Sequence, residues 1–168
     1  MSERPQLGPV RRADPVLRPA AGEADMATVR ALFIAYGRSL DFSLCFQGFD
    51  QELATLPGAY APPAGRLLLA ETANIALGVV ALRPLGSDAC EMKRLYVDPA
   101  WRGHGVGLRL ARAILDEARA AGYRTMRFDT HLSMTAAIAL YRALGFREIP
   151  RYYDNPLEGI VYFERDLA

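Results

Sequence analysis

The sequence contains few of the residues that build metal centres and disulfide frameworks. Two histidines and two cysteines occur among 168 residues. Cys45 and Cys90 stand alone, and neither His104 nor His131 has a thiol or carboxylate at the spacing of a metal ligand. We therefore expect no bound metal, and we interpret the cysteines as structural thiols in a reducing cytoplasm.

Long apolar runs and an excess of charge of one sign are also missing. No apolar segment reaches the length of a membrane span, and the N-terminus lacks the apolar core of a signal peptide. Lysine and arginine together number 20 against 19 acidic residues, and Lys93 is the only lysine. A net charge of +1 does not indicate a nucleic-acid partner. We expect a cytoplasmic protein that binds neither membranes nor nucleic acids.

The residues that are present predict one folded domain. An apolar fraction of 51% fits a globular chain of 168 residues. Residues 1–14 are interpreted as a flexible N-terminal tail and residues 15–168 as a single domain. The hydrophobic patterns predict strands at 16–18, 66–71, 75–82, 90–97, 125–130, 146–149 and 160–165, and helices at 25–40, 50–56, 108–121 and 134–144. We expect Asp50 and Ser133 to cap the second and fourth helices. This order predicts an α+β domain with a mixed sheet.

A glycine-rich run, Arg102-Gly-His-Gly-Val-Gly107, lies between the strand at 90–97 and the helix that follows. A glycine turn that leads into a helix presents unpaired backbone N–H groups at the positive end of the helix dipole, where a phosphate can bind. The spacing matches neither the dinucleotide fingerprint nor a nucleotide P-loop. A tight strand-to-helix turn with positive φ at its glycines is the alternative.

Two segments identify the family that the chain resembles. Cys90–Val97, Asp98-Pro99 and Arg102-x-x-Gly105-x-Gly107 resemble motif A of the GCN5-related N-acetyltransferase (GNAT) superfamily. Ala137–Tyr141 and Leu144–Phe146 resemble its motif B. The resemblance implies a mixed, mostly antiparallel sheet of six to seven strands flanked by about four helices. It also implies acetyl-CoA as the acyl donor.

The resemblance assigns cofactor contacts to two places. The strand end Leu95, Tyr96 and Val97 would pair with the pantetheine amides, and a backbone N–H near Leu95 would polarise the thioester carbonyl. Met134 stands where many members of the family carry an asparagine that contacts pantetheine. The backbone N–H groups that would surround the pyrophosphate belong to Arg102, Gly103, His104, Gly105, Val106, Gly107 and Leu108.

Tyr141 is the candidate general acid. A phenol can supply the proton that the departing thiolate needs, and motif B places a tyrosine at this position. The alternative is a core tyrosine, because Tyr141 shares a helical stripe with Ala137, Ile138 and Leu144.

Glu91 is the candidate general base, because it lies eleven residues before Arg102, where histone-type members carry a catalytic glutamate. Strict alternation along the strand would place Glu91 and Lys93 on the same face as Leu95 and Val97, although a bulge would shift Glu91. An ion pair with Lys93 or Arg94 is the alternative role. A water chain could serve as the base instead.

The acceptor site is expected in the first helices and the closing strands. Aromatic and acidic side chains gather there, as a site for a small amine requires. The candidates are Asp41, Phe42, Glu52, Tyr152, Tyr153 and Asp154. We therefore predict an N-acetyltransferase that moves an acetyl group from acetyl-CoA to a primary amine of a small-molecule or peptide acceptor. The alternatives are a non-catalytic acyl-CoA-binding regulatory domain and a nucleotide-binding fold. A homodimer is suggested only by the resemblance, because members of the family often form dimers.

Overall fold

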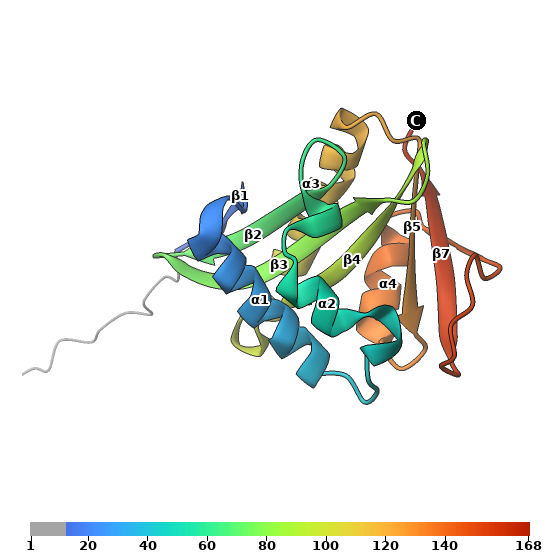
Figure 1. The fold of residues 1–168 in the computed structure, drawn as a ribbon, viewed down its shortest axis with the longest axis horizontal. Helices are drawn as coiled ribbons and strands as arrows, with labels where there is room; N and C mark the ends of the chain where they lie inside the picture. Colours follow the sequence, from blue (N-terminus) through green and yellow to red (C-terminus); the bar gives the residue numbers. More distant parts are fainter. Residues whose placement is uncertain (1–12) are drawn as a thin grey trace, which may run out of the picture.

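The computed structural model describes residues 13–168, and over these residues it forms one seven-stranded sheet with four α-helices (Figure 1). The strands are β1 (Val16–Pro19), β2 (Arg66–Thr72), β3 (Ile75–Pro84), β4 (Ala89–Val97), β5 (Thr125–His131), β6 (Arg147–Ile149) and β7 (Ile160–Asp166). The helices are α1 (Gly22–Arg38), α2 (Phe49–Ala54), α3 (Val106–Ala120) and α4 (Thr135–Ala143). The expected α+β fold is confirmed. Most of the expected tail, residues 1–12, lies outside the described part.

The sheet has the order β1-β2-β3-β4-β5-β7-β6. Within the described chain its ladders are antiparallel except for the β4–β5 pair. This parallel ladder joins Ala89–Glu91 to Thr125–Arg127 and stops there. The two strands therefore separate beyond Glu91, and the backbone at the end of β4 has no β5 partner.

Two apolar clusters pack against the two faces of the sheet. One includes Leu110 and Ile114 of α3 together with Met92 of β4, and the other includes Val29 and Phe33 of α1. Figure 1 shows α1 and α2 on the near side of the sheet. The amphipathic stripe of α3 is therefore buried as its spacing predicts.

A bulge interrupts β4 at Arg94. Arg94 has a φ of 61°, and the register with β3 shifts there, because Val79 pairs with Tyr96 while Ala81 pairs with Lys93. One β3 residue therefore faces two β4 residues, which is the definition of a bulge.

The bulge overturns the expected alternation along β4. Met92 packs in the α3 cluster before the bulge, and Leu95 and Val97 pack against the same cluster after it. Glu91 therefore points to the opposite face, which is also the face of Tyr96. The expectation that Glu91 shares a face with Leu95 and Val97 is wrong, because the extra residue inverts the alternation.

The expected helix caps are also corrected. Gly48 precedes α2 in a left-handed conformation, and Asp50 lies inside the first turn of the helix. Met134 is the N-cap of α4, while the Ser133 hydroxyl lies 2.7 Å from His131 Nδ1. Neither polar residue caps its helix, because the preceding turn places it one or two residues from the cap position.

The described residues include no helix long and apolar enough to cross a membrane. Over the same part of the chain, no three His, Cys, Asp or Glu side chains are grouped so that they could hold a metal ion.

Candidate functional site

A groove of about 550 Å³ lies between the end of β4, the glycine turn and the start of α4. The groove is lined by residues from both segments that the sequence predicts to contact the cofactor. His104 is the one predicted cofactor residue that does not line it. The predicted residues that line it are Leu95, Tyr96, Val97, Arg102, Gly103, Gly105, Val106, Gly107 and Leu108. The opening between β4 and β5 thus leaves an unpaired strand edge beside the turn.

The turn itself depends on two left-handed glycines. Gly103 and Gly105 both have a φ of 78°, and Gly105 is the N-cap of α3. Among the described residues, no side chain caps this helix end. The first N–H groups of α3 can therefore donate to an anion in the groove.

The Arg102 side chain serves the turn rather than the groove. Its Nε donates to the Val97 carbonyl at 3.1 Å, and its guanidinium lies 5.7 Å from the centre of the Tyr96 ring. His104 Nδ1 lies 3.0 Å from the Arg102 carbonyl, and its ring packs near Trp101. The Nε contact thus holds Arg102 against β4 at the edge of the groove, beside the backbone N–H groups that can bind an anion.

A smaller inner pocket of about 90 Å³ adjoins the groove. Leu95 and Met134 line both spaces. Tyr141 lines the inner pocket and packs on Phe128, with the ring centres 4.1 Å apart. Burial raises the pKa of Tyr141, so its phenol is protonated at neutral pH. Its hydroxyl makes no hydrogen bond within residues 13–168, and it faces the pocket.

Met134 provides no amide at the position where the family carries an asparagine. Its Sδ accepts a hydrogen bond from Thr130 Oγ1 at 3.4 Å. This part of the wall can therefore supply packing but no strong donor.

Glu91 is almost fully buried, with 1% of its side chain exposed. Arg83 lies 2.7 Å from Oε1, and the Tyr152 hydroxyl donates to Oε2 at 2.5 Å. Burial raises the pKa of Glu91, but the charges of Lys93 and Arg83 outweigh it and hold the pKa below its usual value. Glu91 lines an outer hollow of about 370 Å³ and not the inner pocket.

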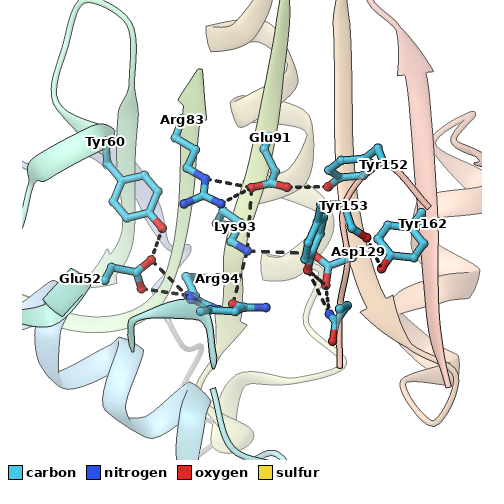
Figure 2. Close-up of polar contacts among 12 residues, drawn as sticks. Glu52, Tyr60, Arg83, Glu91, Lys93, Arg94, Asp129, Tyr152, Tyr153 and Tyr162 are labelled. Atoms are coloured by element: carbon cyan, nitrogen blue, oxygen red, sulfur yellow. Dashed lines mark hydrogen bonds and ion pairs between the residues drawn. The ribbon is translucent and has the colours of Figure 1, made fainter. Parts of the chain in front are cut away.

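Lys93 lies between Glu91 and Asp129 (Figure 2), and it lines both the outer hollow and the inner pocket. Its Nζ lies 3.9 Å from a carboxylate oxygen of Glu91 and 3.9 Å from Oδ1 of Asp129. Asp129 of β5 also lines the inner pocket, as does Tyr36 of α1. Sequence reasoning considered Asp129 only as a possible substitute for the missing asparagine at the cofactor, and it gave Lys93 and Tyr36 no role in the site. The tertiary pairing of β4 with β5 and the packing of α1 bring the three residues together.

The predicted acceptor residues are divided among three spaces. Phe42 lines both the groove and the inner pocket, whereas Asp41 lines the groove alone. Tyr152–Asp154 line the outer hollow, on the far side of Lys93.

Glu52 is occupied by other side chains. Its carboxylate pairs with Arg94 at 3.0 Å and accepts a hydrogen bond from the Tyr60 hydroxyl at 2.5 Å. Only 3% of the Arg94 side chain is exposed. The contacts of Glu52 therefore neutralise a buried guanidinium beside the bulge.

The chain is similar in sequence and in structure to known acetyltransferases. Residues 34–146 match the sequence model of the acetyltransferase (GNAT) family. An uncharacterised N-acetyltransferase of Schizosaccharomyces pombe is 36% identical over 146 residues, which cover 86% of this chain and 90% of that protein. A GNAT-family acetyltransferase of Staphylococcus aureus superposes with a TM-score of 0.77 at 17% identity, covering 92% of this chain and 99% of the other. A Salmonella typhimurium protein solved with its cofactor acetyl-CoA superposes with a TM-score of 0.70 at 22% identity, covering 93% of this chain and 95% of the other.

Proposed function

The chain belongs to the acetyltransferase (GNAT) family and is an N-acetyltransferase, and from this premise we propose that it uses acetyl-CoA to acetylate a primary amine. The amine would attack the thioester directly while both substrates are bound. The acetyl-CoA in the Salmonella typhimurium neighbour supports the choice of donor. The free thiols of Cys45 and Cys90 support a reducing cytoplasm as its compartment.

The observation that carries this proposal is the groove in which the glycine turn meets the open edge of β4. The residues fit the donor: the N–H groups at the start of α3 would hold the pyrophosphate, and the backbone of Leu95–Val97 would pair with the pantetheine amides. When bound, the donor supplies an activated acetyl group as a thioester. A backbone N–H near Leu95 would stabilise the negative charge that develops on the carbonyl oxygen.

We assign the general acid to Tyr141. As the amine nitrogen bonds to the carbonyl carbon, the carbon–sulfur bond breaks and the thiolate takes the phenolic proton. The position of Tyr141 in the inner pocket, next to the groove, supports this role, and so does its unengaged hydroxyl. Its raised pKa means that the phenol carries its proton at neutral pH, as a general acid must before the reaction.

The amine must also lose a proton, and Glu91 and water are the two candidate bases. Both Glu91 oxygens accept hydrogen bonds from other side chains, and Lys93 separates the carboxylate from the inner pocket. This arrangement favours water as the direct base. Glu91 then acts as a positioning residue that holds Lys93 and Tyr152.

The test combines binding with turnover. Calorimetry measures acetyl-CoA binding, and a thiol reagent measures CoA released with a panel of amines. Tyr141→Phe should lower kcat by about 10²- to 10⁴-fold without weakening the binding of acetyl-CoA. Tyr123→Phe is the control, because its hydroxyl donates to the Ala64 carbonyl away from the groove. Acetyl-CoA binding without turnover on any amine would instead support a non-catalytic acyl-CoA-binding domain, and absence of binding would refute both.

A further inference from the structure

The inner pocket contains the buried amine of Lys93, which has unused donors. Burial lowers the pKa of Lys93, while the carboxylates of Glu91 and Asp129 favour its charged ammonium form. Only 6% of the Lys93 side chain is exposed. Within the described chain its one hydrogen bond is a long contact of 3.4 Å to Gln47 Oε1. The carboxylates of Glu91 and Asp129 lie 3.9 Å away, beyond direct hydrogen-bond distance. An ammonium has three N–H donors, so Lys93 retains capacity for an anionic partner.

A buried carboxylate lies beside this ammonium. The Asp129 side chain is 8% exposed, and its Oδ2 accepts from Tyr153 at 2.8 Å and from Asn155 at 3.4 Å. Its Oδ1 accepts no hydrogen bond from residues 13–168, and the nearest cation is Lys93. Since no fully enclosed side-chain oxygen of the described chain lacks a partner, Oδ1 faces the pocket space.

The other buried charges near the pocket are already paired. Arg83 compensates Glu91, and Arg94 compensates Glu52. Lys93 and Asp129 are left with each other at 3.9 Å, beyond direct hydrogen-bond distance, so each can still hydrogen-bond to a ligand in the pocket. An acceptor with only an ammonium would add an uncompensated charge to this buried site, which is costly. An acceptor with both an ammonium and a carboxylate would leave every charge paired.

The order of residues along the pocket gives such an acceptor a direction. Lys93 and Gln47 also line the outer hollow, so they mark the end of the inner pocket farthest from the groove. Leu95 and Met134 mark the end that opens to the groove. The pocket volume of about 90 Å³ is smaller than a cavity of about 150 Å³ that accepts benzene. The space therefore suits a small polar head group.

We propose that the inner pocket binds a small zwitterionic acceptor, of the amino-acid class, with its amine on Asp129 and its carboxylate on Lys93. This inference rests on the proposed acetyl transfer and names its substrate class. The amine then lies on the groove side, toward Tyr141, and the carboxylate lies on the side of Gln47.

The experiment compares acceptors that differ only in the carboxylate. Acetylation of alanine, alaninamide and ethylamine is measured by CoA release, with acetyl-CoA binding measured separately by calorimetry. We expect alanine to have a kcat/KM about 10- to 100-fold above that of both analogues, as the loss of a hydrogen bond to a charged group predicts. Equal or better use of the two analogues would overturn the inference while leaving acetyl transfer intact. Failure to bind acetyl-CoA would refute the proposed function itself.

A variant pair tests the assignment to Lys93. Lys93→Met should remove the preference for alanine while acetyl-CoA binding is retained, and Lys93→Arg should keep part of the preference. Arg124→Met removes an exposed cation on a distant surface and is the matched control. An equal loss for all three acceptors in Lys93→Met would contradict the assignment. If Lys93→Met does not fold, the ranking of acceptors by the unmodified protein and by Lys93→Arg still decides the outcome.

Discussion

Replacement of Gly105 by alanine tests whether the left-handed turn prepares the groove for an anion. Gly105 has a φ of 78°, and a Cβ added there meets no atom within 4 Å. The cost of alanine is therefore conformational and not a clash with the protein. A left-handed conformation costs a residue with a Cβ about 1–2 kcal/mol.

This strain can appear in either of two measurements. If the alanine turn stays left-handed, the free energy of unfolding falls by about 1–2 kcal/mol and the Kd for acetyl-CoA is preserved. If the turn relaxes to negative φ, stability is preserved, but the first N–H groups of α3 turn away from the groove. The Kd then rises about 5- to 30-fold. Denaturant unfolding and calorimetry on the same preparation measure both quantities.

Gly107→Ala is the control for Gly105→Ala. Gly107 lies within α3 with an ordinary φ, and an added Cβ would meet Val97 Cγ2 at 3.7 Å, a normal contact. We expect no loss of affinity and a small gain in helix stability. An unchanged Kd and unfolding free energy in Gly105→Ala, or equal losses in the two variants, would refute the reasoning.

Three further predictions concern other parts of the molecule. Glu52→Ala leaves Arg94 buried and unpaired, so the free energy of unfolding should fall by about 3–5 kcal/mol. Unchanged stability together with a raised KM for the acceptor would instead indicate that Glu52 contacts the acceptor. The hydrogen bond from Arg18 lowers the pKa of Asp25 from 3.8 to about 2. The protein should therefore be more stable than Asp25→Asn by its full difference above pH 3.8, and this difference in unfolding free energy should vanish as the pH falls through about 2. A difference independent of pH would contradict this. Met134→Asn restores the amide of the family and should tighten acetyl-CoA binding about 2- to 10-fold by one hydrogen bond; calorimetry that shows no gain would remove Met134 as a cause of weaker binding.

The sequence predicts the elements that have strong local signals. The helix after the glycine turn follows from its apolar spacing, and Gly122 follows it in a left-handed conformation, which is common just after a helix. The groove follows from the motif, because the turn and the strand before it are adjacent in the chain. These features depend on residues close in sequence, which is where periodicity and turn chemistry are informative.

The face of Glu91 and the membership of the inner pocket could not be predicted in the same way. The bulge occurs at Arg94, a residue type without preference for a positive φ, and it is held by the buried ion pair with Glu52 from another element. Lys93 and Asp129 meet because the β4–β5 register, with Glu91 opposite Arg127, brings them opposite each other two residues beyond the end of the ladder. Both facts depend on tertiary contacts that leave no periodic signal in the sequence.

A crystal structure of the protein with acetyl-CoA bound tests the central claim most directly. We predict the pyrophosphate within hydrogen-bond distance of the N–H groups at residues 103–108, pantetheine along Leu95–Val97, and the thioester sulfur beside the Tyr141 hydroxyl. Binding of acetyl-CoA outside the groove, or a thioester placed away from Tyr141 and the inner pocket, would contradict the account.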